Sequence, residues 1–329
     1  MRWSPALRQL LPQKLKERPA EYRLAVDSVS KFYNSFYVSG WFHHEALTLT
    51  GVSLVEEDLR GVISRVGIPH GGVESDLGPN KGFFLQVLRS TDRLPDIDEL
   101  ELVFTMSDGA AICRSLGLLI KERNRNNRSA SISSDFYERV NASAGTRLLD
   151  VGGRDRSRID RSKQFPGVET IVLDIIAGDN VDVVGDAHEM SHLFPENHFD
   201  FVYSVSVFEH LAMPWKVACE MNRVMKIGAV GLVHSHQMIG MHDAPWDFFR
   251  FSDTAWNGLF NKHTGFELLA SAMDDPQYAI PFLYRNGKED AERSAGFESS
   301  TVMFRKIGPP GVSWDVSLSD VIETSYPED

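Results

Sequence analysis

Four short apolar runs, spaced along residues 146–206, constrain the fold of this chain more than any other feature. They cover residues 146–153, 170–174, 181–186 and 199–206, and each ends in acidic or small residues. Runs of this length, rich in Val, Ile, Leu and Phe, are typical of strands buried inside a parallel sheet. We therefore expect an α/β domain built around these four strands.

The ends of these runs are where a ligand is expected. In an open parallel sheet, ligands bind outside the carboxyl ends of the strands. Asp174 follows Asp150 by 24 residues, about the spacing at which a dinucleotide-type fold places the carboxylate that binds a ribose. Gly152 and Gly153 allow the backbone to turn tightly beside a ligand. Together these residues predict a nucleoside site.

In this region the chain resembles the class I S-adenosylmethionine-dependent methyltransferases. The resemblance is carried by the segments LLDVGG, VLD, GDAHEM, FDFVYSVSVFEHL and EMNRVMKIGAVGLV, in the order and spacing of that family. It covers roughly residues 131–306. It implies a Rossmann-like, seven-stranded methyltransferase sheet, with S-adenosyl-L-methionine as the cofactor and methyl transfer as the reaction.

The resemblance also implies a role for each strand end. Asp174 would accept hydrogen bonds from the ribose hydroxyls, since a carboxylate can bind two neighbouring hydroxyls. Asp186 and Ala187 would border the adenine, and Ser204 and Val205 would lie beneath the transferred methyl group. The full set of implied cofactor-binding residues is Asp150, Gly152, Gly153, Asp174, Asp186, Ala187, Ser204, Val205 and Glu209.

The glycine turn departs from the family pattern, Asp-x-Gly-x-Gly-x-Gly. Here the second and third glycine positions hold Arg154 and Arg156, and Gly153 is displaced by one residue. A side chain where the backbone approaches a ligand closely can crowd the methionine part of the cofactor. This leaves an alternative function open: a non-catalytic module on a degenerate methyltransferase fold that binds a glycan or a partner.

A second alternative arises from the histidines of residues 188–198. His188, Glu189 and His192 match H-E-x-x-H, and His198 stands where a metzincin protease has its third zinc ligand. The residues just before this motif favour a strand, whereas a zincin requires an established helix. Pro195 also replaces the glycine at which the zincin chain turns. A zinc metalloprotease is therefore the remote alternative.

The acceptor is best indicated by residues 232–256, a segment too polar and aromatic for a simple connection. It resembles the segment Asp-aromatic-Arg-Phe that follows the fifth strand of methyltransferases associated with polysaccharide synthesis. That resemblance implies a sugar or glycan-linked acceptor and glycosyltransferases as partners. Transfer to a hydroxyl usually needs a base, for which His234, His236 and His242 are candidates, oriented by Asp247. No metal site is assigned, although a metal held by His and Asp is an alternative.

The chain of 329 residues is long enough for two domains. Apolar residues at near-helical spacing predict an N-terminal helix within residues 1–36, and short alternating runs over residues 37–120 predict a small antiparallel β-sandwich. The polar residues 121–132 read as a linker. Residues 133–329 then form the methyltransferase domain, whose tail carries Trp314 and Tyr326 and is expected to pack back on it.

The composition narrows the partners and the compartment. A net charge of −12 argues against a nucleic-acid partner, which would need a basic surface. The two cysteines, Cys113 and Cys219, read as buried thiols of a reducing compartment. No stretch approaches the ~18 apolar residues that suggest a membrane span. The expected location is the cytoplasm.

Overall fold

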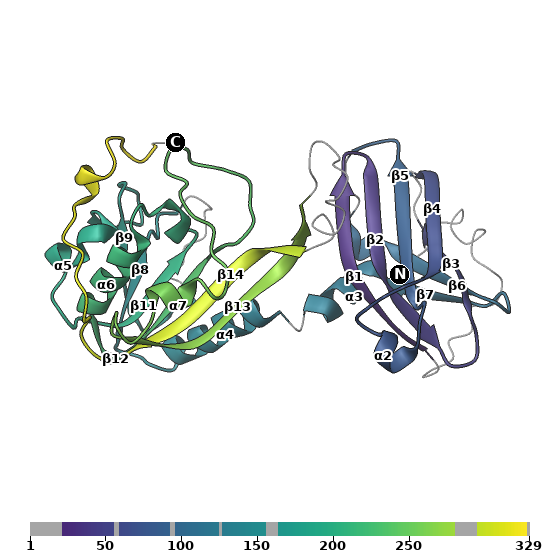
Figure 1. Cartoon of the computed structure of the whole chain (residues 1–329), viewed down its shortest axis with the longest axis horizontal. Helices are drawn as coiled ribbons and strands as arrows, with labels where there is room; N and C mark the ends of the chain where they lie inside the picture. Colours follow the sequence, from purple (N-terminus) through teal and green to yellow (C-terminus); the bar gives the residue numbers. More distant parts are fainter. Residues whose placement is uncertain are drawn as a thin grey trace. The chain divides into compact units, whose positions relative to one another are not determined.

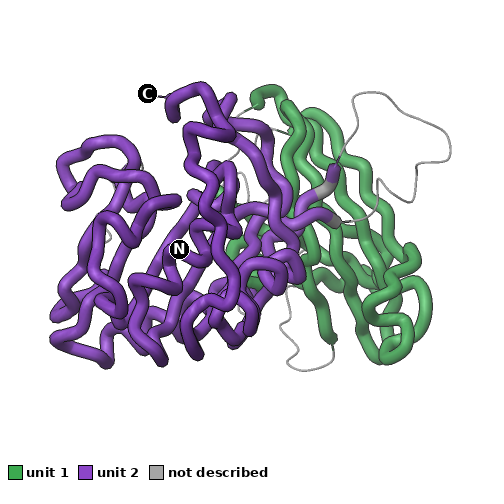
Figure 2. The backbone as a smooth tube through the Cα atoms, turned by 60° about the vertical axis from the view of Figure 1, so that its left-hand side comes forward, with its two compact units in different colours: residues 1–126 green, residues 127–329 purple. Residues whose placement is uncertain are grey.

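The computed structural model describes residues 22–55, 59–92, 96–124, 127–155, 164–279 and 295–327 of the chain. It divides into two compact units, residues 1–126 and residues 127–329 (Figure 2). Within the described ranges, no helix is both long and apolar enough to cross a membrane.

Unit 1 contains two antiparallel sheets (Figure 1). The first has the order β1-β2-β5-β4, with β1 at Tyr22–Phe32, β2 at Ser35–His44, β5 at Gly82–Arg89 and β4 at Leu59–Ile68. The second has the order β3-β6-β7, with β3 at Leu49–Val55, β6 at Glu101–Met106 and β7 at Ala111–Ser115. Short helices lie at Glu74–Leu77 (α2), Ile97–Glu99 (η1) and Leu116–Asn124 (α3).

Both sheets of unit 1 contribute to one hydrophobic core. Alternate residues of β2, such as Phe36 and Val38, are buried, and they join Phe104 of β6 and Leu116 of α3. Alternation of this kind is what a strand with one buried face requires. The arrangement is the one that the predicted sandwich needs.

One prediction for the N-terminal half is wrong, and another, the linker, holds for its position between the two units but not for its structure. The predicted helix ends at residue 36, but residues 22–32 form β1, which pairs with β2 as a hairpin. Residues with helical spacing there are also β-branched and aromatic, and pairing with a neighbouring strand decides between the two structures. The rest of that helix, residues 1–21, lies outside the described residues.

The predicted linker, residues 121–132, is largely helical. α3 continues to Asn124, and α4 begins at Arg128. The side chain of Asn127 accepts a hydrogen bond from the backbone N–H of Ala130, at 2.7 Å. A polar tract therefore starts a helix here, because an Asn at this position satisfies a free N–H of the first turn.

Unit 2 is built on a mixed sheet of seven strands in the order β10-β9-β8-β11-β12-β14-β13. The strands are β8 (Arg147–Val151), β9 (Glu169–Asp174), β10 (Val183–Val184), β11 (Phe199–Val205), β12 (Met225–His236), β13 (Phe266–Tyr278) and β14 (Ala295–Lys306). The first five in the sheet are parallel, and β14 runs antiparallel to both of its neighbours. The predicted Rossmann-like sheet is confirmed.

Helices cover both faces of this sheet (Figure 1). Successive residues of a strand point to opposite faces, so Leu148 packs with Phe136 of α4 while Leu149 packs in the core that contains α6 and α7. The helices are α4 (Arg128–Asn141), α5 (Met190–Leu193), α6 (Pro214–Val224) and α7 (Trp256–Leu259), with 3-10 turns η3 (Ala187–Glu189), η4 (Phe208–His210) and η5 (Leu318–Asp320).

Candidate active site

A cleft opens where the strand order of unit 2 reverses. From β8 the chain moves outward through β9 and β10, and then returns to place β11 on the other side of β8. Such a switch point leaves a crevice outside the strand ends. The cleft there has an empty volume of about 690 Å³, counted out to its open mouth, and is lined mainly by residues that follow β8, β9, β10 and β11.

The turn after β8 requires its first glycine. Gly152 has a φ of +73°, which L residues rarely adopt, and a Cβ added there would lie 2.2 Å from Cγ2 of Val207. Its N–H donates to the carbonyl of Leu173 at 2.7 Å. The turn therefore brings bare backbone to the wall of the cleft.

Asp174, at the end of β9, is held at the cleft wall. Its Oδ1 accepts the N–H of Ile176 at 2.9 Å, and its Oδ2 accepts the N–H of Arg154 at 3.2 Å. Nε of Arg154 lies 3.9 Å from Oδ1. Since each carboxylate oxygen has two lone pairs, Asp174 keeps acceptor capacity for a ligand.

Asp186, after β10, forms a local network with His188. Its Oδ1 accepts the backbone N–H of His188 at 2.9 Å and lies 2.7 Å from Nδ1 of that imidazole. Burial alone would raise the pKa of Asp186, but these hydrogen bonds and the charge of Lys216 together hold its pKa below the usual range. Asp186 therefore presents a carboxylate to the cleft at neutral pH.

The structure brings only four of the nine predicted cofactor-binding residues to the cleft. Gly152, Asp174, Asp186 and Ala187 line the cleft. Asp150 and Gly153 lie behind the turn, where a Cβ at Gly153 would meet Oδ2 of Asp150 at 2.5 Å. Glu209 lies at the neighbouring histidine cluster described below. The remaining members, Ser204 and Val205, belong to β11.

Ser204 and Val205 do not line the cleft, so they cannot have the predicted role beneath the methyl group. Ser204 is fully buried, and its Oγ donates to the carbonyl of Val151 at 3.0 Å. The strand continues through Val205, so the residues that reach the cleft are the next two, Ser206 and Val207. The predicted run, residues 199–206, includes the whole strand, but the role at the cleft was assigned to residues two positions before those that line it.

Several cleft residues were not predicted. Arg154, Ser206, Val207, His210, Leu211, Trp246 and Tyr326 also line it. His210 follows Glu209 in a segment that carries the resemblance, so its position in the sequence was a signal for a place at the cleft. Trp246 and Tyr326 come from a loop and from the tail, and nothing in the sequence places them near β8.

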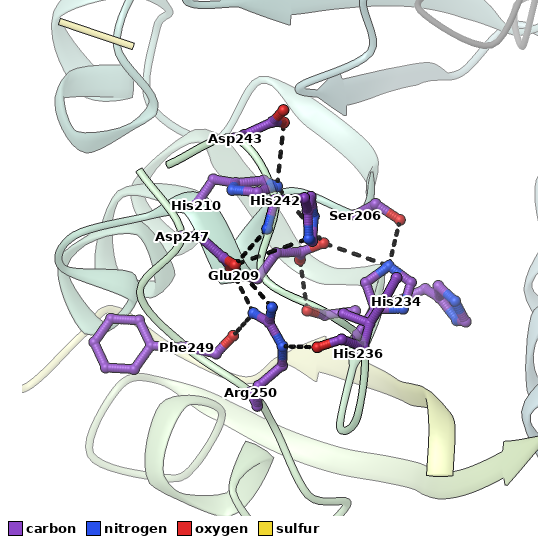
Figure 3. Close-up of polar contacts among 12 residues, drawn as sticks. Ser206, Glu209, His210, His234, His236, His242, Asp243, Asp247, Phe249 and Arg250 are labelled. Carbon is purple, nitrogen blue, oxygen red and sulfur yellow. Dashed lines mark hydrogen bonds and ion pairs between the residues drawn. The ribbon is translucent and has the colours of Figure 1, made fainter. Parts of the chain in front are cut away.

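A cluster of imidazoles and carboxylates lies beside the cleft (Figure 3). Glu209 is fully buried; its Oε2 accepts the hydroxyl of Ser235 at 2.6 Å, and its Oε1 accepts no hydrogen bond. Nε2 of His236 lies 3.5 Å from that Oε1 and 3.2 Å from Oγ of Ser206. Nε2 of His210 lies 3.9 Å from the same Oε1.

The predicted catalytic residues meet here only in part. The rings of His236 and His242 lie edge to face, with centroids 6.4 Å apart. His234 is directed to Thr301, with Nδ1 2.8 Å from Oγ1. Asp247 forms two hydrogen bonds with the guanidinium of Arg250, at 2.6 and 2.8 Å.

Asp247 acts on the loop instead of on an imidazole. Its Oδ2 accepts the backbone N–H of His242 at 2.9 Å but lies 3.8 Å from Nδ1 of that ring. Hydrogen bonds from Arg250 lower the pKa of Asp247 to about 2, although burial opposes the shift. The carboxylate is 2% exposed, so its contact with Arg250 anchors the segment that carries His242.

The C-terminal tail reaches both the cleft and the cluster. Tyr326 lines the cleft, and its hydroxyl donates to Oδ2 of Asp243 at 2.8 Å. The indole N–H of Trp246 donates to Oγ1 of Thr324 at 3.1 Å. The tail therefore packs on unit 2, as predicted, through these hydrogen bonds.

The histidines of the remote protease alternative are not brought together. His188 is buried in η3, with Nδ1 beside Asp186 and Nε2 3.3 Å from the backbone N of Met213. His192 lies in the separate helix α5 with 76% of its side chain exposed. His198 packs edge-on against Phe199. The H-E-x-x-H motif does not lie on one helix, so it lacks the geometry of a zincin.

Part of unit 2 is similar to a known protein family. Residues 162–233 match the family model described as a methyltransferase domain. No curated protein matches the chain. Among solved structures, a SAM-dependent methyltransferase from Archaeoglobus fulgidus has 16% identity and a TM-score of 0.41, with 57% of this chain and 99% of that chain covered. A putative methyltransferase from Bacillus halodurans has 15% identity and a TM-score of 0.40, with 53% and 98% covered. Such TM-scores do not define the fold, which rests on the strand order.

Unit 2 thus combines a Rossmann-like strand order, a cleft at the switch point and a match to a methyltransferase domain over residues 162–233. The residues of the cleft fit the cofactor that the sequence predicted, S-adenosylmethionine. Gly152 presents backbone at the cleft wall, Asp174 and Asp186 offer acceptors at two strand ends, and apolar side chains such as Leu173 and Leu211 line the wall between polar groups.

Proposed function

We propose that the protein transfers a methyl group from S-adenosylmethionine to a hydroxyl of a sugar or glycan-linked acceptor. The observation that carries the proposal is the cleft at the switch point, which has Asp174 at the end of one strand and Asp186 at the end of the next. When bound, S-adenosylmethionine supplies an electrophilic methyl group on a sulfonium.

Different residues of the cleft would bind different parts of S-adenosylmethionine. Asp174 would accept hydrogen bonds from the ribose, since it is acceptor-only and already fixed by two backbone N–H groups. Asp186 and Ala187 would border the adenine. The turn at Gly152 would admit the methionine part close to the backbone. Fixing the donor in this way favours in-line transfer.

The acceptor would approach from the histidine cluster. A hydroxyl needs a group that takes its proton as the methyl is transferred. His236 supports this role best among the predicted histidines, because its Nε2 is 3.2 Å from Ser206, a residue that lines the cleft. Asp247 would keep the loop and His242 in place, as a positioning residue.

Two titrations and an assay test the proposal. Calorimetry with S-adenosylhomocysteine should give saturable binding at one site, and Asp174→Ala should weaken it on the order of 100-fold, since loss of a charge-assisted contact costs about 1.5–3 kcal/mol. Asp179→Ala, at an exposed position that is not among the cleft-lining residues, is the matched control. A panel of sugars, nucleotide sugars and lipid-free glycans, assayed for methyl incorporation, then tests the acceptor. A folded protein that gives no heat at millimolar ligand would remove the proposal.

A second function is favoured by Arg154. Its backbone N–H and its guanidinium both lie at Asp174, where the ribose is expected to bind. A domain in which that cation occupies the ribose position would be a non-catalytic module that binds a glycan or a partner. Arg154→Gly separates the two: a gain in S-adenosylhomocysteine affinity of tenfold or more supports the module, and an unchanged or weaker affinity supports the enzyme.

The compartment and partners follow from this function. Two free cysteines, Cys113 and Cys219, fit a reducing compartment such as the cytoplasm. A glycan acceptor would make glycosyltransferases the natural source of the substrate. Methyl incorporation into the product of a co-expressed glycosyltransferase would test both points.

A further inference from the structure

The buried carboxylate of Glu209 faces two imidazole nitrogens beside the cofactor cleft. Glu209, His210 and His242 each offer one ligand atom, and these atoms lie within 4.8 Å of one another. Glu209 is fully buried and His210 is 8% exposed, while His242 is 34% exposed on the open side. Figure 3 shows these three side chains converging from η4 and from the loop after β12.

The outer hydrogen bonds fix which nitrogen of each ring faces the cluster. Nδ1 of His210 lies 2.7 Å from the carbonyl of Trp246, and Nδ1 of His242 lies 3.0 Å from the carbonyl of Gly240. A carbonyl only accepts, so each Nδ1 carries a proton and donates it. Nε2 is then left with its lone pair in both neutral rings. Metal-binding histidines in proteins use this same arrangement of one donated N–H and one free nitrogen.

Glu209, His210 and His242 therefore each bring one possible ligand atom to the same place. Oε1 of Glu209 is buried, accepts no hydrogen bond, and lies 3.9 Å from Nε2 of His210. Its other oxygen is fixed by the hydroxyl of Ser235. A buried carboxylate oxygen without a donor is costly, and two facing lone pairs increase that cost. A cation among the three atoms would remove it.

We propose that Glu209, His210 and His242 form a binding site for a divalent transition-metal ion of the zinc type. Two imidazoles and one carboxylate are a ligand set found in catalytic zinc sites, which keep a further position for water or substrate. Bonds of about 2.0–2.1 Å at tetrahedral angles would set the ligand atoms about 3.3 Å apart. The present spacing is wider, so small side-chain rotations close the site. Magnesium is excluded as the preferred ion because it favours an all-oxygen shell.

The position of the site suggests its use. His210 lines the cofactor cleft as well as the metal site, so an ion bound there would border the space in which methyl transfer takes place. A metal ion lowers the pKa of a coordinated hydroxyl and orients it. Resting on the proposed function, the ion would bind the acceptor hydroxyl, and His236 would lie beside it to receive the proton.

Metal binding can be tested without any activity. The full chain is freed of metal with a chelator, dialysed, and titrated with Zn²⁺ and separately with Mg²⁺ by calorimetry. We expect one Zn²⁺ per chain with micromolar or tighter affinity, and no heat from Mg²⁺ at the same concentration. Glu209→Gln and His242→Asn should each weaken Zn²⁺ binding at least tenfold, on the order of the effects seen when metal sites lose a partner. Circular dichroism confirms that each variant is folded.

The controls separate this site from adventitious zinc. His192 is 76% exposed and pairs with Glu189, so His192→Asn removes a surface imidazole and should leave the affinity unchanged. Zinc binding that is lost in His192→Asn but retained in Glu209→Gln and His242→Asn overturns the proposal, as does the absence of any saturable site. S-adenosylhomocysteine titration of the same samples reports on the proposed function separately.

Discussion

The cleft at the switch point and the cluster of Glu209, His210 and His242 lie at the same edge of one sheet, but they are built in different ways. The cleft takes Asp174 and Asp186 from the ends of neighbouring parallel strands and fixes them with backbone N–H groups. The cluster takes Glu209 and His210 from one turn and His242 from a loop anchored by Asp247 and Arg250. One site follows from sheet topology, whereas the other depends on how a long loop is held.

This difference predicts that damage to one site spares the other. The cleft should fail when the strand ends or the turn at Gly152 change, with metal binding retained. The cluster should lose Zn²⁺ affinity when the contacts that hold its loop are removed, with cofactor binding largely retained. The following variants test this separation.

Gly152→Ala should have the largest effect. The new Cβ meets Val207 at 2.2 Å and the residue must hold a φ of +73°, so we expect overpacking of about 1–3 kcal/mol on top of strain of about 1–2 kcal/mol. Binding of S-adenosylhomocysteine should fall on the order of 100-fold, measured by calorimetry. Zn²⁺ affinity should remain unchanged.

Gly228→Ala is the matched control for that variant. Gly228 has a φ of +85° with nothing within 4 Å of a Cβ, so its substitution costs only the strain. Chemical unfolding should therefore give a smaller loss for Gly228→Ala than for Gly152→Ala, with cofactor affinity intact. Equal losses in both would mean that Val207 moves aside and that the turn is not a close approach.

Arg250→Met tests the loop. It leaves the 2% exposed carboxylate of Asp247 without its cation, which should lower the free energy of unfolding by about 3 kcal/mol. Arg305→Met removes an ion pair with Glu267 whose side chains are 49% and 40% exposed, and should cost less than about 1 kcal/mol. We expect Zn²⁺ affinity to fall with Arg250→Met and S-adenosylhomocysteine affinity to change less than about tenfold. The reverse pattern would contradict the separation.

The strand ends could be predicted from the sequence, because strand chemistry and its period are local. Asp174 and Asp186 lie at the cleft as expected, since each follows a short run of residues that forms a strand of the parallel sheet. For β11 the role at the cleft was assigned to Ser204 and Val205 instead of Ser206 and Val207, because nothing local distinguishes residues inside the strand from those that follow it. An error of two residues is enough to exchange a buried hydroxyl for one that faces the cleft.

The cluster could not be predicted in the same way. His236 and His242 were candidates, but the sequence gives no sign that Asp247 would pair with Arg250 instead of with an imidazole. His210 was overlooked as a possible ligand, since its free nitrogen depends on a hydrogen bond to a carbonyl 36 residues away. Contacts over such separations are decided by the folded loop and not by local propensity.

Asp186→Asn should have a moderate effect that depends on pH. Asn keeps an acceptor for His188, so only the charge is lost, and we expect about 1 kcal/mol at pH 7. The pKa of Asp186 in the folded protein lies below its ordinary value of 3.8, so the wild-type advantage is present above pH 3.8 and disappears as the pH falls below it. Thermal unfolding of both proteins between pH 7 and pH 3 measures this. An advantage that grows on acidification would show that the carboxylate is not stabilised in its charged form.

Tyr326→Phe should have the smallest effect, and it tests the one segment that joins the two regions. The hydroxyl of Tyr326 donates to Asp243 at 2.8 Å, beside His210, while its ring lines the cleft. Loss of one partly exposed hydrogen bond costs about 1 kcal/mol, which corresponds to an affinity change of about fivefold at most. We expect such a change for both S-adenosylhomocysteine and Zn²⁺ in calorimetry, and none for Tyr33→Phe, whose side chain is 76% exposed in unit 1. A loss beyond about 50-fold in either ligand would mean that Tyr326 contacts that ligand directly, because no tether through Asp243 could transmit so much free energy.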